Sequence, residues 1–461
     1  MRRATHGQGA GVRLRTTVPV ARAVALPRAV AFAVALVGAL ALALAACGSV
    51  RHDPKPAPPV AVASPVVKPL RPARPSPAAI ALGVALRRWL ALEGPGGAGA
   101  VYDLQAQAPL FALRAGNKQP PASVEKLYTS LALARKLGPG ARLHTTVLGT
   151  GHLGPGGVWH GNLYLRGGGD PTLGDGTFNR VFEFGYGPTT LQLTQQLTQD
   201  GIHSVTGSVI GDASLFDSSR GGPATGDAPD IPDFGGQLGG LTYDHGATGR
   251  LSPGAFAAKQ FVLTLAGAHV KAVAARSTAR TPPGARSLAV VSSPPVSVML
   301  RLMDVPSDDF FAEMLTKQLG ARFAHAGTIS AGARVIKQVI KGFGLHPTIV
   351  DGSGLSRSDR SSPLEVVDLL RDLWRTPDGD LLEASLPVVG INGTVRNIAT
   401  RTAAQGNCEA KTGTLNGVTN VAGYCRTRSH HVLAFALFAQ GPTNARALVL
   451  EGQMLAAIAR F

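Results

Sequence analysis

The sequence lacks the short motifs by which metal ions are usually bound. Neither His-Glu-x-x-His nor Cys-x-x-Cys occurs, and the adjacent His430 and His431 do not have metal-ligand spacing. Only three cysteines occur among 461 residues, which excludes a small protein held together by disulfides. Hydrophobic residues make up 44% of the chain, enough to bury a core, so a fully disordered protein is excluded as well. We therefore expect a globular protein with no metal and no cofactor.

The net charge of +17 is unevenly distributed along the chain. Residues 1–46 contain six Arg and no acidic residue, and residues 47–77 contain five Lys or Arg against the single Asp53. Ten of the seventeen net positive charges thus precede residue 78. The rest of the chain has no block of Lys and Arg of the kind that follows phosphate groups. We expect no nucleic-acid partner, and a mildly basic body beside acidic polymers of the cell surface.

Residues 1–46 have the composition of an export signal. Six Arg precede an apolar run without charge from Ala29 to Ala46, which ends in small residues. Its end, Leu44-Ala45-Ala46-Cys47, resembles a bacterial lipoprotein box, in which Cys47 would be lipidated and become the first residue. Cleavage after an Ala-x-Ala site and an uncleaved anchor stay open, because a run of about 18 residues is at the lower limit for a span. We expect an exported protein in the cell-wall space, held at the outer face of the cytoplasmic membrane through Cys47.

Residues 47–77 predict a linker. Nine prolines lie between Asp53 and Pro77, and such a segment cannot form the hydrogen bonds of a helix or a sheet. It is typical of a semi-rigid spacer that holds a domain away from the membrane. The same composition fits a disordered tail without a role.

Periodicity divides the remaining chain into three parts. Helices are predicted at 78–93 and 123–137, with a strand at 100–104 between them. From about 145 to 290, short alternating runs are interrupted by Gly, Pro and Asp, which predicts a β-rich segment with little helix. After residue 297 we predict helices and then strands, at 298–303, 310–319, 332–342, 364–375 and 445–457, and at 408–415, 418–425 and 432–438. The simplest organisation is one α/β domain built from residues 78–145 and 291–461, with a β-rich insertion at 146–290.

Cys408 and Cys425 are predicted to form a disulfide across a β-hairpin. Asn416-Gly417 is a strong two-residue hairpin turn, and each cysteine lies eight residues from it. The two residues would therefore face each other at a non-hydrogen-bonded pair, where Cα atoms approach to about 4.5 Å. Two free buried thiols are the alternative.

Ser123-Val124-Glu125-Lys126 can provide an activated nucleophile. Positions three apart lie on one face of a helix, so the Ser123 hydroxyl and the Lys126 amine can meet. A partly desolvated Lys can accept the serine proton, so no histidine is needed. The free N–H groups at the start of the helix can face a developing oxyanion. Alone, Ser-x-x-Lys also fits the start of a surface helix, but Pro-Ala-Ser-x-x-Lys-Leu is more specific.

Two further short segments can contribute to such a site. Lys411-Thr412-Gly413-Thr414 lies on the first predicted strand of the hairpin, where a Lys and a small hydroxyl residue can hold a carboxylate. Gly413 would let a ligand lie close to the backbone. Ser307-Asp308-Asp309 precedes a predicted helix, where a Ser N-cap followed by acidic residues is also locally favourable in any protein.

Together and in this order, the three segments resemble the Ser-x-x-Lys, Ser-x-Asn and Lys-Thr-Gly motifs of the penicillin-recognising serine enzymes. Four more segments resemble one branch of them, the D-alanyl-D-alanine carboxypeptidase/endopeptidase family, or class C low-molecular-mass penicillin-binding proteins. These segments are Gly167-Gly168-Gly169-Asp170-Pro171-Thr172-Leu173, Gly211-Asp212-Ala213-Ser214-Leu215-Phe216-Asp217, Asp351-Gly352-Ser353-Gly354-Leu355-Ser356-Arg357 and Gly393-Thr394. The resemblance runs from about residue 78 to 461. It implies an α/β penicillin-binding transpeptidase-like (β-lactamase-like) domain, with a large insertion between the first and second catalytic motifs.

The resemblance also implies a role for each motif residue. Ser123 would be the acylated nucleophile, Lys126 its general base, and Ser307 the relay of a proton to the leaving D-alanine amine. Lys411 and Thr412 would bind the terminal carboxylate, while the N–H groups of Ser123 and Thr414 would form the oxyanion hole. The expected partners are peptidoglycan stem peptides ending in D-Ala-D-Ala and β-lactam antibiotics, which should acylate the same serine.

One position departs from the family pattern, because Asp309 stands where the second motif has Asn. An amide donates and accepts hydrogen bonds, whereas an ionised carboxylate only accepts. Near Lys126 a carboxylate would favour the charged ammonium and weaken the base, unless burial keeps Asp309 protonated. The alternative function is therefore a catalytically weak or inactive protein that binds penicillin or the cell wall.

Overall fold

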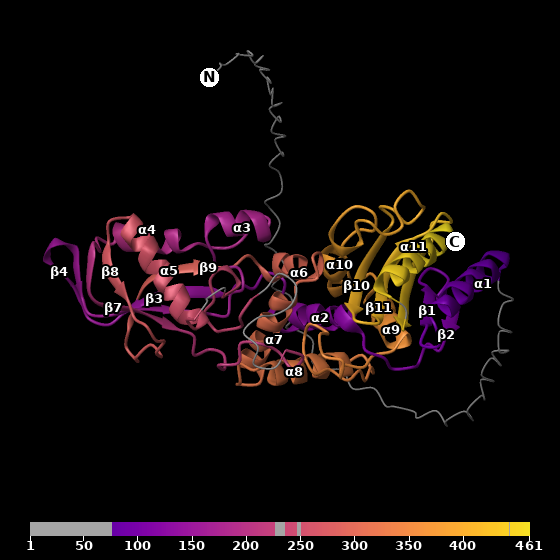
Figure 1. Ribbon diagram of the computed structural model, residues 1–461, viewed down its shortest axis with the longest axis horizontal. Coiled ribbons are helices and arrows are strands. Elements are labelled where there is room, and N and C mark those ends of the chain that lie inside the picture. Colours follow the sequence, from indigo (N-terminus) through magenta and orange to yellow (C-terminus); the bar gives the residue numbers. More distant parts are fainter. Residues whose placement is uncertain (1–75, 226–235, 247–249, 442) are drawn as a thin grey trace, which may run out of the picture. The chain divides into compact units, whose positions relative to one another are not determined.

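Residues 76–225, 236–246, 250–441 and 443–461 are described by a computed structural model of the chain (Figure 1). The predicted export signal, Cys47 and nearly all of the predicted linker lie outside these ranges. The described residues belong to one compact unit. None of its helices, over the ranges described, combines the length and the apolar character needed to cross a bilayer.

The first sheet combines strands from both ends of the chain. Its five antiparallel strands lie in the order β10-β11-β12-β1-β2. Their bounds are β10 Cys408–Leu415, β11 Val418–Arg426, β12 Val432–Gln440, β1 Ala98–Asp103 and β2 Ala108–Leu113. This arrangement confirms the predicted α/β fold class.

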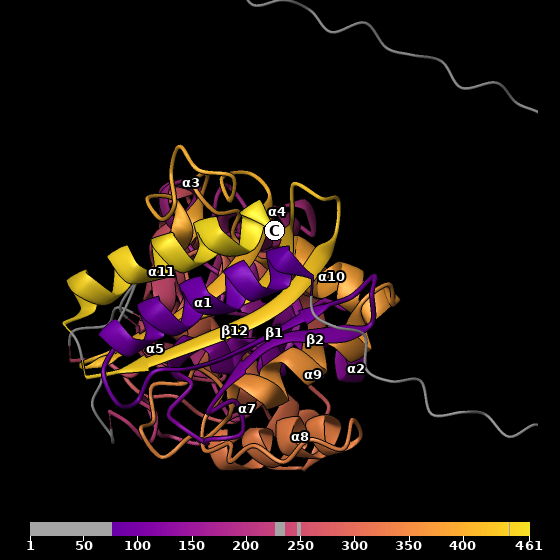
Figure 2. The ribbon, with the colours of Figure 1, turned by 90° about the vertical axis from the view of Figure 1, so that its right-hand side faces the viewer.

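Helices cover both faces of this sheet. On one face, α1 (Pro77–Leu92) and α11 (Asn444–Arg460) pack over the strands, and α9 (Pro363–Leu373) lies on the other (Figure 2). The remaining helices of this part are α2 Lys126–Leu137, α6 Val296–Asp304, α7 Asp309–Phe323, α8 Ile329–Lys341 and α10 Pro377–Ser385. Successive residues of a strand point to opposite faces, so Phe435 of β12 packs with α1 and α11 while Phe438 packs with the other helices.

A second sheet occupies the chain between the first and second motifs. Its seven strands are mixed, with β5, β6 and β8 parallel to β7. The bounds are β3 His144–Gly149, β4 His152–Gly154, β5 Val158–His160, β6 Leu163–Arg166, β7 Ser204–Asp212, β8 Lys271–Ala274 and β9 Arg286–Ser292. A separate hydrophobic core lies between this sheet and its helices.

The prediction of little helix between 145 and 290 is wrong. Three helices occur there, α3 (Gly176–Phe182), α4 (Thr190–Gln199) and α5 (Pro253–Gly267). The Gly and Pro residues that indicated turns also mark helix starts: Ser252 caps α5 and Pro253 is its first residue.

The described chain also contains short 3₁₀ helices, η1 Ala122–Glu125, η2 Pro155–Gly157, η3 Asp244–Gly246 and η4 Gly393–Val395.

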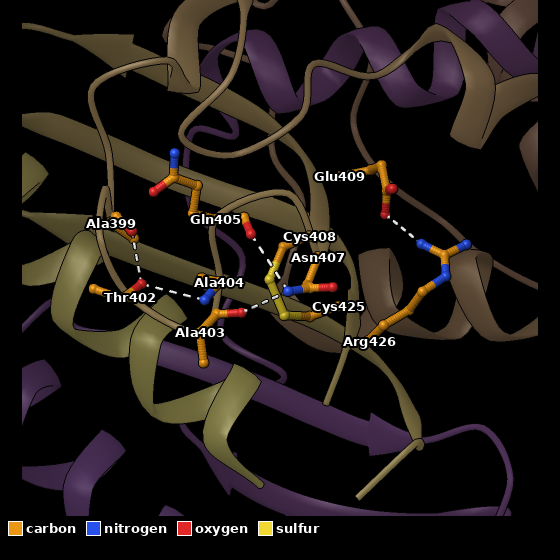
Figure 3. Close-up of a disulfide and its surroundings, with 10 residues drawn as sticks. All are labelled: Ala399, Thr402, Ala403, Ala404, Gln405, Asn407, Cys408, Glu409, Cys425 and Arg426. Carbon is orange, nitrogen blue, oxygen red and sulfur yellow. Dashed lines mark hydrogen bonds and ion pairs between the residues drawn. A yellow bond between two sulfur atoms is a disulfide. The ribbon is translucent and has the colours of Figure 1, made fainter. Parts of the chain in front are cut away.

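Cys408 and Cys425 are joined by a disulfide, as the hairpin geometry predicts (Figure 3). The two residues are partners in the β10–β11 register, and their Cα atoms are 4.0 Å apart. Beside them, the Arg426 guanidinium and the Glu409 carboxylate form an ion pair of 2.8 Å between the same two strands. The alternative of two free thiols is therefore wrong. The bond connects the two strands at the end of the hairpin remote from its turn.

Candidate active site

Ser123 and Lys126 meet at the start of α2. Ser123 lies in the 3₁₀ turn η1, and Lys126 is the first residue of the α-helix, so the start is tighter than the continuous helix predicted. The Lys126 Nζ donates a hydrogen bond of 3.0 Å to the Ser123 Oγ. The preceding Ala122 has a φ of +48°, in the left-handed region that non-glycine residues rarely adopt. The nucleophile candidate therefore follows a constrained turn in the backbone.

Three oxygen atoms surround the Lys126 amine. Besides Ser123, it contacts the Ser353 carbonyl oxygen at 2.8 Å and the Asp309 Oδ1 at 2.5 Å. The side chains of Lys126 and Asp309 are 0% and 1% exposed, so this is a buried ion pair. The carboxylate of Asp309 therefore holds the same Nζ that contacts the Ser123 hydroxyl. The position that departs from the family pattern therefore lies in direct contact with the proposed base.

Ser307 belongs to the same site through Lys411. The Lys411 Nζ donates to the Ser307 Oγ at 2.7 Å and to the Thr412 carbonyl at 3.0 Å. Ser307 has a φ of +66° and precedes α7, whereas Asp308 caps that helix by accepting from the Phe311 N–H at 2.8 Å. The alternative of a Ser307 N-cap is therefore wrong, and its hydroxyl faces a lysine from the distant hairpin instead.

Strand β10 borders the site along the edge of the sheet. Lys411 is buried, Thr412 is 7% exposed and Thr414 is exposed. A side chain at Gly413 would place its Cβ 2.5 Å from the Pro121 carbonyl oxygen and 3.1 Å from the Ser123 nitrogen. Glycine is therefore required because the backbone before the serine lies against this strand. The sequence predicted glycine here for a different reason, the close approach of a ligand. The contact also brings Thr414, the next residue of β10, beside Ser123.

Asn420 is a site residue that sequence reasoning missed. It faces Gly413 in the β10–β11 register, and its Nδ2 donates to the carbonyl oxygens of Pro120 and Pro121 at 3.0 and 2.9 Å. Its Oδ1 accepts from the Ala439 N–H at 3.2 Å. Asn420 thus connects the sheet to the turn before Ser123. Its place opposite Gly413 in the predicted hairpin was the only signal for it.

Two buried carboxyl groups behind the lysines were also missed. The Asp304 Oδ2 accepts from the hydroxyls of Ser130 and Ser385 at 2.7 and 2.8 Å. Burial raises the pKa of Asp304 to about 6, against the lowering effects of Lys411 first and of its other neighbours. Asp304 is therefore an acidic group close enough to be influenced by both lysines of the site.

The other buried carboxyl group is Glu313, one turn along α7 from Asp309. Its Oε1 accepts from the N–H groups of Gly352 and Ser353 at 3.2 and 3.0 Å. Burial, and then the negative charge of Asp351, raise the pKa of Glu313 to about 8. The carbonyl of the same Ser353 accepts a hydrogen bond from Lys126. Glu313 therefore orients a backbone group that contacts the proposed base.

The turn at 351–356 is held by hydrogen bonds to the side chain of Asp351. The Asp351 carboxylate accepts from the N–H groups of Gly354 and Ser356 at 2.7 and 2.8 Å. Gly354 has a φ of +81°, and its Cα lies against the Ala122 carbonyl, where no Cβ fits.

Over the described ranges, no three His, Cys, Asp and Glu side chains are grouped so that they could hold a metal ion.

The mixed α/β domain has the fold of penicillin-binding proteins and β-lactamases. Ser-x-x-Lys, a second serine and Lys-Thr-Gly meet on it, which is the motif set of the penicillin-recognising serine enzymes. The chain belongs to the D-Ala-D-Ala carboxypeptidase 3 (S13) family, which matches residues 80–248 and 251–460. It is therefore a serine peptidase, and D-Ala-D-Ala carboxypeptidase is the activity of its family.

Two curated relatives and one solved structure illustrate this membership. Carboxypeptidase DacB of Mycolicibacterium smegmatis is 30% identical over 85% of this chain and 87% of its own length. The D-alanyl-D-alanine carboxypeptidase of Actinomadura sp. is 25% identical over 80% and 82%. The crystal structure of penicillin binding protein 4 (dacB) from Haemophilus influenzae aligns with a TM-score of 0.67 at 18% identity, over 83% of this chain and 99% of that one. The structural likeness shows the shared fold.

Proposed function

We propose that the protein is an exported D-alanyl-D-alanine carboxypeptidase/endopeptidase that cleaves peptidoglycan stem peptides through a serine acyl-enzyme. The observation that carries this proposal is the meeting of the Ser123 hydroxyl with a buried lysine, Lys126, at 3.0 Å. Beside it, Ser307 and Lys411 are joined at 2.7 Å. The site therefore contains a nucleophile, a proton acceptor, a second hydroxyl and a second cation.

In the proposed acylation step, the Ser123 oxygen attacks the carbonyl carbon of the penultimate D-alanine. Lys126 in its neutral form takes the serine proton, and a C–O bond forms. The peptide C–N bond then breaks, and a proton passed through Ser307 reaches the departing amine. Lys411 and Thr412 bind the terminal carboxylate, and the N–H groups of Ser123 and Thr414 stabilise the oxyanion. Water finally hydrolyses the ester and restores the serine.

β-Lactams should acylate the same serine. The Haemophilus influenzae structure has also been determined with a novel β-lactam, and it aligns with this chain at a TM-score of 0.65. Opening of the lactam C–N bond by Ser123 would leave the amine attached to the acyl group. We therefore expect a stable covalent adduct on Ser123.

The second candidate is a penicillin- or wall-binding protein with weak or no turnover. The buried contact between Lys126 and Asp309 at 2.5 Å favours this candidate, because the carboxylate holds the amine that would have to accept the serine proton. A protein of this kind would bind penicillin or the cell wall in the same pocket but catalyse the chemical step slowly or not at all.

Fluorescent penicillin and D-alanine release separate the candidates. The purified full chain should be labelled covalently by the penicillin, and the Ser123→Ala variant should not. If the wild-type protein that penicillin labels also releases D-alanine from a stem pentapeptide, it is a carboxypeptidase. Labelling without release favours the binding protein, and an unlabelled wild-type chain contradicts the acyl-enzyme.

The location outside the cytoplasm is part of the proposal and depends on the sequence of residues 1–47. Export by the basic and apolar signal, followed by lipidation of Cys47, would place the enzyme at the membrane face next to its polymeric substrate. In cells, a Cys47→Ala variant should move from the membrane fraction to the soluble exported fraction. A variant that stays with the membrane would contradict the lipid anchor and favour an uncleaved span.

A further inference from the structure

His245 is a buried histidine of the chain between the first two motifs (the 146–290 segment). It lies in η3, and its Nε2 forms a hydrogen bond of 2.7 Å with the Oε1 of Glu183, the residue that follows α3. Both side chains are buried. His245 and the preceding Asp244 have φ values of +55° and +48°, in the left-handed region that residues with a side chain rarely adopt. The fold thus holds this imidazole in one place by means of an unfavourable backbone conformation.

The imidazole packs on the first turn of α7. Its ring stacks on Phe310, with 4.3 Å between the ring centroids, and meets the ring of Phe311 edge-on at 5.7 Å. Both phenylalanines are buried, and they directly follow Asp309, whose carboxylate contacts Lys126. Because a protein interior is closely packed, a shift of the imidazole is transmitted to the start of this helix.

The backbone of the second motif depends on support of this kind. Ser307 has a φ of +66°, and a non-glycine residue keeps such a conformation only where its surroundings hold it. The Asp308 carboxylate fixes the start of α7 by accepting from the Phe311 N–H at 2.8 Å. The His245 ring lies against the residue that supplies this N–H. The 146–290 segment therefore supports the turn that carries Ser307.

Three carboxyl groups lie near the imidazole. Glu183 contacts it from the end of α3, Asp308 precedes α7, and Asp244 belongs to the same turn as His245. Burial raises the pKa of Asp308 to about 7 and that of Asp244 to about 6, and in both cases the charge of His245 acts against this rise. A protonated His245 therefore favours the ionised form of the carboxylate that caps α7.

We propose that His245, held by Glu183, is a positioning residue for the second motif. It acts through Phe310, and through the charge of the Asp308 cap, on the turn that carries Ser307. This inference rests on the proposed serine acyl-enzyme and adds to it a residue outside the three motifs. His245 takes no part in making or breaking bonds. The 146–290 segment is then a required part of the active site.

The rate of acylation by fluorescent penicillin, measured on the purified full chain from pH 6 to pH 9, tests this role. H245Q removes the ring and its charge but keeps an N–H that can reach a carboxylate. E183Q keeps an acceptor for the His245 N–H and removes only the negative charge, so it tests the proposal even if H245Q does not fold. The control H269Q replaces an exposed histidine of the same segment whose φ, +61°, is also left-handed. Thermal unfolding of each variant measures its stability.

We expect H245Q to be acylated about tenfold or more slowly than the wild type at pH 6, and E183Q to be slowed by a smaller factor. Lys126 and its contacts are common to the wild type and H245Q, so the ratio of their rates reports on His245. As the pH rises the imidazolium loses its charge, so this ratio should fall towards pH 9. H269Q should be acylated at the wild-type rate at every pH.

The opposite results are equally clear. A ratio that stays constant from pH 6 to pH 9, together with a lower thermal stability of H245Q, would assign His245 to packing alone and overturn the proposal. Wild-type rates in H245Q would overturn it as well, as would wild-type rates in E183Q if H245Q does not fold. A wild-type chain that penicillin does not label shows instead that the underlying acyl-enzyme proposal has failed.

Discussion

Asp309 lies against Lys126, the proposed general base. The two side chains are buried and in contact at 2.5 Å, so a carboxylate lies directly against the Nζ of Lys126. An Asn at this position keeps a polar group beside Lys126 and removes the charge. We expect Asp309→Asn to raise the rate of acylation by fluorescent penicillin by about tenfold at neutral pH, because it removes the carboxylate that competes with Ser123 for the Lys126 Nζ.

The control for this experiment is Asp200→Asn, which removes an equal charge at an exposed position after α4. Its acylation rate should equal that of the wild type. A tenfold fall in Asp309→Asn, about 1.4 kcal/mol, would show that the pocket depends on the acid.

Glu313 is predicted to act as a positioning residue for Lys126. It accepts from two N–H groups of the 352–353 turn, whose Ser353 carbonyl contacts Lys126. Burial and the charge of Asp351 raise the pKa of Glu313 to about 8, which favours the protonated carboxyl, a group similar in shape to an amide. We expect Glu313→Ala to slow acylation by about tenfold or more, and Glu313→Gln to restore it at pH 7.

The pH profile separates positioning from a general structural role. As the pH rises through about 8, Glu313 ionises in the wild type next to Asp351, whereas the Gln variant cannot. The acylation rate of Glu313→Gln relative to wild type should therefore change between pH 7 and pH 9. Identical profiles for the two proteins, with unequal thermal stability, would assign Glu313 to stability alone.

The residues of the site differ in how far sequence could predict them. Ser123 and Lys126 are three positions apart, so helix geometry alone predicts their contact. The contact of Lys411 with Ser307 joins segments about a hundred residues apart, and only the family resemblance indicated it. Asp304 and Glu313 belong to helices in which any acidic residue could be solvated, and their burial follows from tertiary packing that no local pattern contains.

At the scale of elements, strand β10 lies close against η1, the turn that contains Ser123, the proposed nucleophile. Gly413 permits this close approach, because a Cβ there would lie 2.5 Å from the Pro121 carbonyl oxygen. We expect Gly413→Ala to separate the strand from the turn, which would lower acylation by about tenfold or more and stability by about 1–3 kcal/mol. Penicillin labelling rates and thermal unfolding measure the two effects.

Gly116→Ala is the matched control, since no atom lies within 4 Å of a Cβ at that position and its φ is not in the left-handed region. It should leave both labelling and unfolding close to wild type. If Gly413→Ala acylates at the wild-type rate, the close approach of β10 is not what orients Ser123.

Elements were predictable where a local signal had one meaning. The hairpin turn at Asn416-Gly417 determined the β10–β11 register and hence the disulfide. Between 145 and 290 the local signals are ambiguous, because Ser-Pro and Thr-x-x-Gln occur both in loops and at the starts of helices. Thr189 and Gln192 form a capping box at α4, and this pattern was the available signal for that helix.

At the scale of the whole molecule, the first and last described helices share a buried pair of acids. Glu93 follows α1 and Glu451 lies on α11, and both are at most 1% exposed. Burial raises the pKa of Glu93 to about 7 against the opposing charge of Arg446. Burial, and then the charge of Glu93, raise the pKa of Glu451 to about 8. The folded chain therefore holds these protons more tightly than the unfolded chain, whose carboxyls have ordinary pKa values.

The sign of the resulting pH dependence follows from this difference. A group whose pKa is raised by folding contributes stability that is complete below its unfolded pKa and is lost as the pH rises through its folded pKa. For this pair the loss extends from about pH 4.5 to about pH 8. Three other buried carboxyls lower the stability in the same direction as the pH rises. Burial raises the pKa of Asp170 and Asp308 to about 7 and that of Asp359 to about 9. The free energy of unfolding should therefore fall as the pH rises from 5 to 9.

Glu451→Gln isolates the contribution of the α1–α11 pair. The amide cannot ionise, so the variant should unfold like the wild type at pH 5 and be more stable than it by at least about 1 kcal/mol at pH 9. Guanidinium unfolding followed by tryptophan fluorescence at pH 5, 7 and 9 measures the difference, and Asp200→Asn should show the wild-type pH dependence. If Glu451→Gln loses stability with pH as steeply as the wild type, α1 and α11 are not coupled through a shared buried charge. The pH dependence then arises in the other buried carboxyls, Asp170, Asp308 and Asp359.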